Sequence, residues 1–234
     1  MTKTFLEKAD VAKMIEAATN RRDQILIHLL FHLGCRISEA LALEVQNIDL
    51  ENATATIQQL KSRVELACPS CHARVGKYHM YCPKCGRFIQ ETQAKALEHR
   101  RYRTLPIDDK TLDMLRDFIS RGGPVERKGK NLLFGINRHR AWQIIKGCAE
   151  QAGLPKLMNS ESGKLHFVSP HRLRDGFAIN AIGHDDSGTG LRALQLHLGH
   201  ASFNTTAEYV KRSGEQQRAW YNQLWGKDDG HGSS

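Results

Sequence analysis

Four of the six cysteines in this chain have the spacing of metal ligands. They form the pairs Cys68-Pro-Ser-Cys71 and Cys82-Pro-Lys-Cys85, with ten residues between the two pairs. A Cys-x-x-Cys turn aims two thiolates at one point, so two such pairs at this distance predict one tetrahedral four-cysteine zinc site. We expect this zinc to be structural.

Disulfide bonds and a redox motif are the alternatives to a zinc site in this segment. A disulfide framework would suit an oxidising compartment, but residues 1–5 contain no apolar signal segment. A redox Cys-x-x-Cys motif is disfavoured because two pairs are present. His72 or His79 could replace one of the cysteine ligands. The remaining Cys35 and Cys148 lie in segments with apolar periodicity, so we expect them to be buried thiols.

Three further stretches, far apart in the sequence, resemble the catalytic domain of the tyrosine recombinase (phage-integrase) family. Residues 34–43 match the family's G-x-R-x-S-E-x-x-x-L box, and residues 171–174 match its H-x-x-R box. Residues 198–209 match its L-G-H-x-x-x-x-T-T-x-x-Y box. The order and separation of the boxes also fit, and the joint match extends from about residue 5 to about residue 225.

The resemblance implies that this chain breaks DNA strands by forming a covalent ester. Tyr209 would attack a phosphodiester and remain attached through its phenolic oxygen. Arg36 and Arg174 would bind the charge that gathers on the non-bridging oxygens, because guanidinium groups are planar and permanently charged. His200 would donate to the same oxygens, and His171 could accept the tyrosine proton. No cofactor is required for this chemistry, because the ester conserves the bond energy.

The 5′-hydroxyl leaving group needs a general acid, which in this family is a lysine in a β-hairpin turn. The best candidate is Lys61, which follows directly after a strand expected to end at Leu60. Lys95 is the alternative, because the cysteine segment occupies the place where the family has a tight turn.

The elements that must position these residues are mostly helical. The patterns predict paired strands at residues 54–60 and 100–105, a short strand near residues 165–168 and a flexible loop at residues 183–190. The predicted helices cover residues 5–19, 23–33, 38–45, 109–121, 137–152, 170–181, 191–198, 202–211 and 216–225.

The predicted fold class is mainly α with a small antiparallel β-sheet or hairpin. It corresponds to the tyrosine recombinase catalytic-domain fold with a zinc-binding insertion. The catalytic domain is expected over residues 1–226, with a zinc knuckle at 66–90 inserted into the hairpin and a disordered tail at 227–234. The chain starts almost where the family's catalytic domain starts, so the knuckle could partly replace the grip of the usual N-terminal domain.

The charge distribution predicts a nucleic-acid partner. The chain has 234 residues and a formal net charge of +9. Residues 61–103 alone hold ten basic and three acidic side chains. Arg100, Arg101 and Arg103 flank Tyr102 in the second strand and are candidate DNA contacts. We therefore expect double-stranded DNA to be the partner.

The family resemblance also predicts assembly and location. We expect a homo-oligomer, a tetramer, on DNA, with the aromatic-rich helix at residues 216–225 contacting a neighbouring protomer. No run of about 18 apolar residues occurs, so no membrane partner is expected. The expected location is cytoplasmic, associated with the nucleoid or a plasmid. Two alternative functions are a type IB topoisomerase-like strand transferase and a catalytically silent DNA-binding protein on the same fold.

Overall fold

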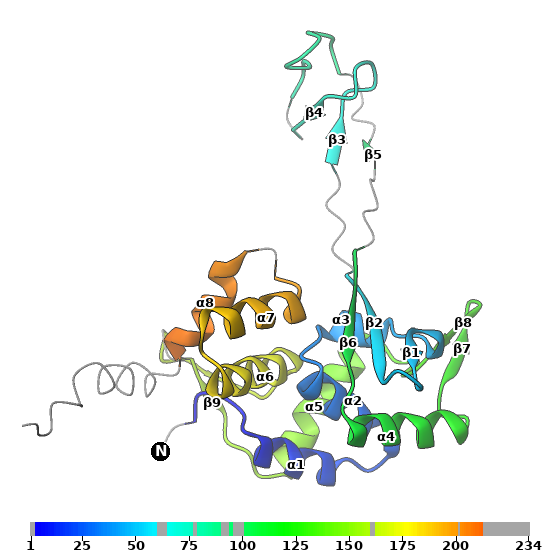
Figure 1. Ribbon diagram of the computed structural model, residues 1–234, viewed down its shortest axis with the longest axis vertical. Helices are drawn as coiled ribbons and strands as arrows, with labels where there is room; N and C mark the ends of the chain where they lie inside the picture. Colours follow the sequence, from blue (N-terminus) through cyan, green and yellow to red (C-terminus); the bar gives the residue numbers. More distant parts are fainter. Residues whose placement is uncertain are drawn as a thin grey trace, which may run out of the picture. The chain divides into compact units, whose positions relative to one another are not determined.

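The computed structural model divides the chain into two compact units (Figure 1). The first unit combines Met1–Ile57 with Thr104–Ser234, and the second unit is Gln58–Arg103. The structure describes residues 3–59, 65–76, 79–89, 94–95, 101–159, 162–200 and 202–212.

The second helix, α2 (Arg21–His32), is largely buried in the core of the first unit. The Asn20 side chain caps it by accepting a hydrogen bond from the Asp23 amide. All residues from Ile25 to Phe31 are buried, so α2 is covered around its circumference rather than along one stripe. Gly34 follows its end with φ 55°, the left-handed conformation that glycine favours. The other described helices that precede α6 are α1 (Lys8–Ala17), α3 (Ile37–Leu41), the 3₁₀ helix η1 (Val45–Asn47), α4 (Asp109–Ser120) and α5 (Arg138–Gln151).

The strands form small sheets. The first has the order β1 (Ile48–Asp49), β2 (Thr54–Gln59) and β6 (Arg101–Pro106), so the two predicted strands are neighbours. The alternating residues Ala55 and Ile57 of β2 are buried, as its sequence pattern predicts. The antiparallel ribbons are β7 (Val125–Arg127) with β8 (Lys130–Leu132), and β9 (Leu157–Met158) with β10 (Leu165–His166). The predicted fold class, mainly α with small antiparallel sheets, is confirmed.

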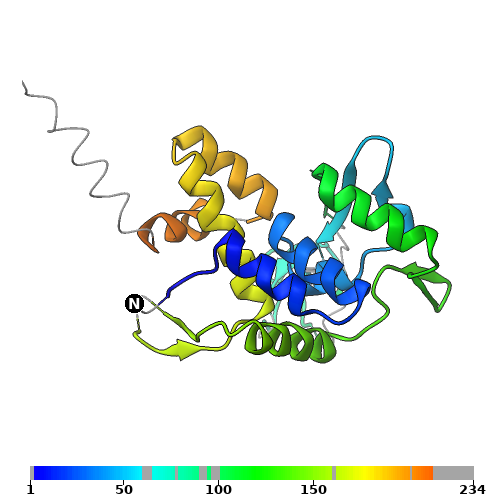
Figure 2. The ribbon, with the colours of Figure 1, turned by 90° about the horizontal axis from the view of Figure 1, so that it is seen from below.

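The last three described helices share an apolar cluster of their own. These are α6 (Pro170–His184), α7 (Gly188–Leu198) and α8 (Phe203–Arg212), which lie together at one end of the first unit (Figures 1 and 2). The cluster that they bury consists of Ala178, Ile179, Ile182, Leu194, Leu198 and Tyr209.

The connection between α6 and α7 is shorter than the loop predicted over residues 183–190. Three residues separate the two helices. The Ser187 side chain accepts a hydrogen bond from the Gly190 amide and caps α7. A Cβ atom on Gly190 would lie 2.4 Å from the Asp185 carboxyl carbon. The glycine is therefore required by close packing, and the prediction of a flexible loop was wrong.

The predicted helix at residues 216–225 and the predicted tail at 227–234 lie outside the described residues. Among the residues that the structure describes, none of the helices combines the length and apolar character needed to cross a lipid bilayer.

A polar relay, buried at His28 and Thr111 and exposed at Asp108, joins α2 to the start of α4. His28 Nε2 lies 2.7 Å from Thr111 Oγ1, and the Thr111 hydroxyl donates to Asp108. His32 Nδ1 lies 3.2 Å from the same carboxylate. Since the threonine proton goes to Asp108, the His28 proton must lie on Nε2. The donor atoms of the two histidines and Asp108 lie within 4.8 Å of one another, as in a metal site, but the Thr111 hydroxyl already engages the group. We interpret it as a structural relay.

This relay predicts acid sensitivity of the fold. Burial, together with the neighbouring His32, lowers the pKa of His28 from 6.5 to about 4. Because the unfolded chain binds the proton more readily, the stabilisation from neutral His28 is complete above pH 6.5 and is lost as the pH falls towards 4. The free energy of unfolding should decrease by up to about 1.4 kcal/mol per pH unit in this window from this group alone.

Urea unfolding between pH 7 and pH 4 measures this effect. His28→Leu should flatten the pH dependence relative to the wild type, whereas His184→Leu, at an exposed position, should leave it unchanged. Equal pH dependence in the wild type and His28→Leu would contradict the assignment.

Candidate functional site

The sixth helix, α6, presents three polar side chains one turn apart. The helix starts with Pro170 at its first position after Ser169, as predicted, although the Ser169 side chain makes no capping hydrogen bond. Residues three and four apart share one face of a helix. His171, Arg174 and Asp175 therefore project from the same side of α6.

Arg174 is buried, with 2% of its surface exposed. Its Nη1 donates to the Gly34 carbonyl at 2.6 Å, and its Nη2 donates to the Leu198 carbonyl at 2.8 Å. The same Nη2 lies 3.0 Å from His200 Nε2. A buried guanidinium needs acceptors for its N–H groups, and here they come from the turn after α2 and the end of α7. One side chain thus joins three segments that are far apart in the sequence.

The Gly34 carbonyl is held in place by tight packing. A Cβ atom on Gly34 would lie 2.4 Å from Phe177 Cδ1, which is too close for two carbon atoms that are not bonded. The ring of Phe177 also stacks on His197, with a centroid distance of 4.9 Å. His197 Nε2 lies 3.0 Å from the Leu33 carbonyl. Both α6 and α7 therefore contact the turn that carries Gly34.

Arg36 begins α3 and is positioned by an acidic side chain on that helix. Glu39 is buried and accepts hydrogen bonds from Arg36 Nη1 and from the Arg36 amide, each at 2.9 Å. About a third of the Arg36 side chain remains exposed, at 32%. Arg36 can therefore reach a ligand in solution while Glu39 fixes its orientation.

His200 lies between Arg174 and the last described helix. Gly199 ends α7 in the left-handed conformation with φ 65°, which turns the chain toward α8. His200 Nδ1 lies 2.9 Å from Oγ1 of the buried Thr206. Because a guanidinium only donates, His200 Nε2 accepts from Arg174, and the imidazole proton of the neutral ring lies on Nδ1. In this arrangement His200 orients Arg174.

Tyr209 is buried on α8, with 5% of its surface exposed. Its hydroxyl donates to Asp175 Oδ1 at 3.0 Å. Its ring lies nearly parallel to that of His200, with a centroid distance of 6.2 Å. His171 Nε2 lies 3.7 Å from the same Asp175 oxygen, and the His171 side chain is 73% exposed. The tyrosine hydroxyl, a carboxylate and an exposed imidazole therefore form one chain of contacts.

The structure brings most of the predicted catalytic residues together in two groups of contacts. Arg174 binds His200, and Tyr209 is linked to His171 through Asp175. The facing rings of His200 and Tyr209 join the two groups, and Arg36 lies two residues after the Gly34 carbonyl that Arg174 binds.

Several predicted residues fall partly or wholly outside this description. Lys61 and Arg100 lie outside the described residues. Lys95 in β5 (Ala94–Lys95) and Arg101 in β6 are described for their backbone only. Arg103 is half-buried in β6.

Some residues of the network were not predicted from the sequence. These are the buried polar residues Glu39, Asp175 and Thr206, and each contacts a predicted catalytic residue through its side chain. The spacing gave a signal for two of them. Glu39 follows Arg36 by three positions, and Asp175 follows His171 by four, the separations at which helical side chains meet.

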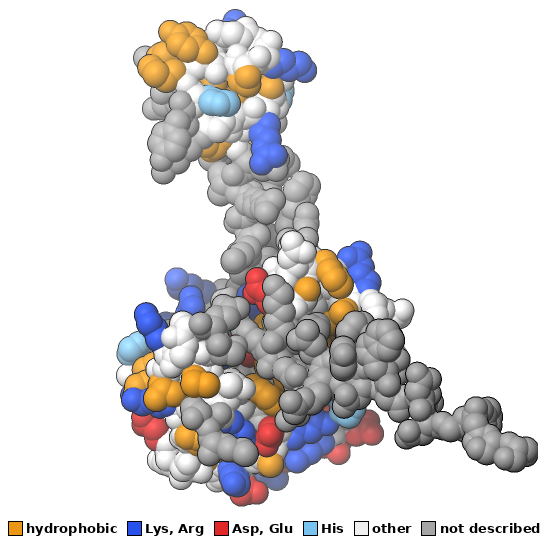
Figure 3. Space-filling view, turned by 90° about the vertical axis from the view of Figure 1, so that its left-hand side faces the viewer, with side chains coloured by type: hydrophobic (Ala, Val, Ile, Leu, Met, Phe, Trp, Pro, Cys, Tyr) orange, Lys and Arg blue, Asp and Glu red, His pale blue; other side chains and the backbone are white. Residues whose placement is uncertain are grey.

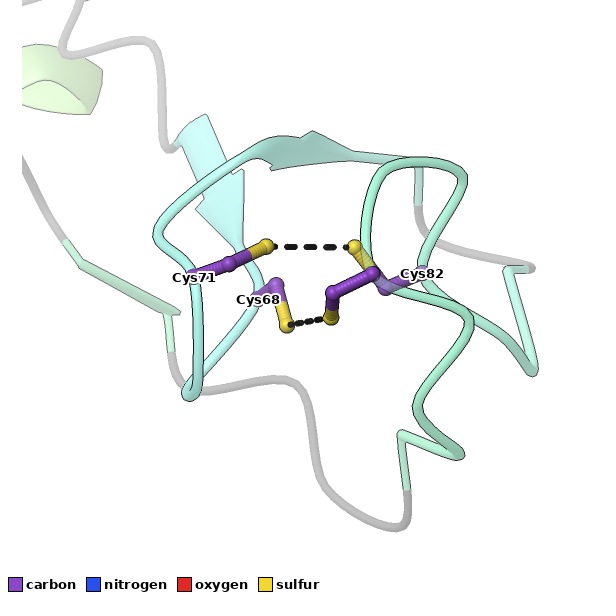
Figure 4. Close-up of side chains that lie close together, drawn as sticks. Cys68, Cys71 and Cys82 are labelled. Atoms are coloured by element: carbon purple, nitrogen blue, oxygen red, sulfur yellow. Dashed lines mark hydrogen bonds between the residues drawn. The ribbon is translucent and has the colours of Figure 1, made fainter.

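The second unit holds the four-cysteine cluster (Figure 4). Cys68 Sγ lies 3.7 Å from Cys85 Sγ, and Cys71 Sγ lies 3.5 Å from Cys82 Sγ. All four sulfur atoms lie within 4.8 Å of one another. Tetrahedral zinc–sulfur bonds of about 2.3 Å place sulfur atoms about 3.8 Å apart, so the donor set fits a zinc-sized ion. The cluster could hold a metal ion.

The two cysteine turns share one backbone design. His72 (φ 55°) and Gly86 (φ 67°) both occupy the left-handed region, four residues after the first cysteine of each pair. Their amides donate to the carbonyls of Cys68 and Cys82, respectively, at 2.9 Å. His72 is thus part of the turn, and the metal-ligand group consists of the four cysteines.

Backbone amides favour the thiolate form of two of these cysteines. The amides of Cys71 and Ser70 lower the pKa of Cys68 to about 6. Those of Cys85 and Lys84 lower the pKa of Cys82. A thiolate is the form that binds metal.

The second unit also exposes hydrophobic side chains, which gather on its surface beside basic ones (Figure 3). Among its described residues, the exposed large hydrophobic ones are Met80, Tyr81, Phe88 and Tyr102. The Tyr81 and Phe88 rings meet edge to face, with a centroid distance of 5.3 Å.

The family comparison matches nearly the whole chain. Residues 4–93 and 88–216 match the model of the phage integrase family. Among curated relatives, the tyrosine recombinase XerD of Neisseria meningitidis serogroup B is 28% identical over 197 residues, which cover 81% of this chain and 50% of the relative. The tyrosine recombinase XerC of Roseiflexus castenholzii is 30% identical over 196 residues, covering 81% of this chain and 47% of the relative. The chain therefore spans about half the length of the curated relatives it matches.

Solved structures show the same fold. The crystal structure of XerA recombinase superposes with a TM-score of 0.63 at 19% identity, covering 96% of this chain and 64% of that one. The catalytic domain of bacteriophage HP1 integrase superposes with a TM-score of 0.51 at 18% identity, covering 97% of this chain and 99% of that one.

The packing at Gly34 predicts a large effect of a single methyl group. Gly34→Ala combines left-handed strain with overlap on the Phe177 ring, so it should lower the free energy of unfolding by about 2–5 kcal/mol. Gly122→Ala is the matched control, because Gly122 also has a positive φ (70°) but no atom lies within 4 Å of its Cβ position. Urea denaturation compares the two variants, and equal losses would show that packing at Gly34 is not the constraint.

Proposed function

This chain belongs to the phage integrase family, and from that premise we propose that it is a site-specific recombinase. It cleaves and rejoins DNA strands through a covalent 3′-phosphotyrosyl intermediate. The observation that carries the proposal is the network in which a buried tyrosine, two histidines and a buried arginine converge beside a second, partly exposed arginine.

Double-stranded DNA is the proposed substrate. Relatives with this fold include XerH recombinase bound to its difH substrate and the Tn1549 integrase in complex with transposon right-end DNA. The net charge of +9 suits a polyanion, and residues 61–103 carry most of the surplus. We extend the proposal to assembly as a homo-oligomer, a tetramer, on DNA, and to DNA contacts by Arg100, Arg101 and Arg103.

Tyr209 is the proposed nucleophile. Its oxygen displaces the 5′ oxygen of the scissile phosphodiester and keeps the phosphorus as an ester, so the reverse step reseals DNA without an external energy source. Arg36 and Arg174 stabilise the negative charge of the transition state. Arg36 does so from a partly exposed position, whereas Arg174 is held rigid by its carbonyl acceptors.

The remaining roles concern hydrogen bonds and protons. His200 orients Arg174, and its proposed donation to the phosphate requires Nε2 to carry a proton and to turn from Arg174 to the DNA. His171 is proposed to help remove the tyrosine proton, because its ring lies near the carboxylate that Tyr209 contacts. Lys61 is the proposed general acid for the leaving 5′ oxygen, with Lys95 as the alternative.

The cysteine cluster is proposed as a structural zinc site, held by Cys68, Cys71, Cys82 and Cys85. Zinc would supply only local folding energy there, since four thiolates complete its coordination. The sulfur geometry supports the assignment.

A nicked suicide DNA substrate tests the nucleophile. The wild type should become covalently attached, whereas Tyr209→Phe should form no adduct and still bind DNA, because phenylalanine keeps the ring and removes only the attacking oxygen. Tyr102→Phe, at an exposed position, is the matched control and should trap normally. Arg174→Lys should be severely impaired, since an ammonium group cannot bridge two carbonyls and a phosphate.

The outcomes of trapping separate the candidate activities. An adduct with Tyr209→Phe would show that another residue attacks. No adduct with the wild type would favour a silent DNA-binding protein. Strand exchange between two duplexes distinguishes a recombinase from a topoisomerase-like enzyme.

Loss of the metal should affect the second unit and spare the helices. Four thiolates around zinc contribute on the order of 10 kcal/mol to the folding of small zinc modules. Cys82→Ser or chelation should therefore abolish the one equivalent of bound zinc, weaken DNA binding and slow cleavage. Far-UV helicity should persist, because the described helices lie in the first unit. Lys84→Ala, in the same turn, is the control and should retain zinc. Full activity and helicity of a Cys82→Ser protein, together with no zinc in the wild type, would refute the assignment.

A further inference from the structure

Asp175 accepts a hydrogen bond from the hydroxyl group of Tyr209, the proposed nucleophile. Tyr209 Oη donates to Asp175 Oδ1 at 3.0 Å. Both side chains are buried, with 5% of Tyr209 and 3% of Asp175 exposed. A carboxylate shielded from water at this distance from a phenol has the geometry of a general base.

The charged and titratable neighbours of Asp175 come from two helices. Tyr209 approaches from α8. On α6, His171 Nε2 lies 3.7 Å from Oδ1, and Arg172 Nη1 donates to Oδ2 at 3.3 Å. Arg172 thus helps to keep the carboxylate in place through the oxygen that does not face the tyrosine. His171 faces the oxygen that does.

We propose that Asp175 is a catalytic residue that takes the proton of Tyr209 during DNA cleavage, with His171 acting behind it. This inference rests on the proposed function. As the bond between Tyr209 Oη and phosphorus forms, the bond between phosphorus and the 5′ oxygen breaks, and the Oη proton passes to Asp175 Oδ1. The leaving 5′ oxygen takes its proton from the general acid on the other side of the phosphate. Rejoining returns the first proton from Asp175 to Tyr209.

The hydrogen bond suits a reversible reaction. Tyr209 donates to Asp175 before any bond to phosphorus exists, and the proton passes to the carboxylate as Oη bonds to phosphorus. His171, whose ring is mostly exposed, contacts the same carboxylate oxygen and so connects it to solvent.

Asp175→Asn tests the proposal in the full chain. An asparagine oxygen can still accept from Tyr209, so the position of the ring is kept while the base is lost. Single-turnover cleavage of the suicide substrate should slow by about 100- to 10,000-fold, with DNA affinity unchanged. Asp186→Asn, an exposed aspartate, is the matched control and should cleave at the wild-type rate.

A modified leaving group locates the defect on the nucleophile side. A substrate with sulfur in place of the bridging 5′ oxygen needs no general acid, since a thiolate leaves unaided. It should rescue Lys61→Ala if Lys61 is that acid, but it should not rescue Asp175→Asn. Rescue of Asp175→Asn by this substrate would overturn the proposal. Faster cleavage by Asp175→Asn would also overturn it, because the hydrogen bond would then be a latch that stores the tyrosine.

A second measurement covers the case in which Asp175→Asn does not fold. Difluorotyrosine at position 209, in an otherwise wild-type chain, makes the phenol more acidic without touching Asp175. If Asp175 accepts the proton as attack proceeds, the pH–rate profile should keep its position in the difluorotyrosine protein. A profile that moves to lower pH with the phenol would show that the tyrosine ionises without this base.

The wild-type and Tyr209→Phe proteins keep the two levels of inference apart. If the wild type forms no covalent adduct, the proposed function fails. If the wild type is trapped, Tyr209→Phe is not, and Asp175→Asn is trapped at the wild-type rate, then only the role of Asp175 fails.

Discussion

The buried guanidinium of Arg174 is the constraint on which the arrangement of the site depends. A charge with 2% exposure is tolerated only if its N–H groups meet acceptors, and removing one acceptor would leave a donor that water cannot reach. The acceptors are two backbone carbonyls and an imidazole, which come from the turn after α2 and from the end of α7. Satisfying one side chain therefore fixes the turn after α2, the end of α7 and the ring of His200 relative to α6.

The two carbonyls are available because each lies at a glycine turn. Gly34 carries one carbonyl itself, and Leu198 carries the other directly before Gly199. Both glycines have positive φ, which side chains with a Cβ atom rarely adopt. At Gly34 the Phe177 ring adds a steric demand. Backbone carbonyls at the glycine turns of two sequence boxes thus accept from the arginine of a third, which is a physical reason for the three boxes to occur together.

Much of this could be predicted from the sequence, because helix signals are local. The apolar run of α2, the proline start of α6 and the glycine end of α7 each follow from neighbouring residues. The role of Asp175 could not be predicted in this way. Its spacing places it beside His171, but its hydrogen bond to Tyr209 spans 34 positions and depends on how α8 packs. The loop predicted between α6 and α7 failed for a similar reason, since the glycine pattern does not distinguish flexibility from the close approach of Asp185 to Gly190.

The second unit follows a different principle, because the apolar core formed by its described residues is small. Among those residues the buried hydrophobic cluster consists of Cys68, Val75, Cys82 and Ile89, so half of it is made of thiols that also belong to the metal-ligand group. Small modules of this kind usually need a metal or disulfides to be stable. If the proposed zinc binds, the thiols lose their protons and form bonds to the metal that strengthen this small core. The folding of this unit then depends on the metal concentration and on pH. The helical unit has its own large apolar core and carries the tyrosine network, so the nucleophile does not depend on the metal, whereas the proposed general acid Lys61 belongs to the second unit.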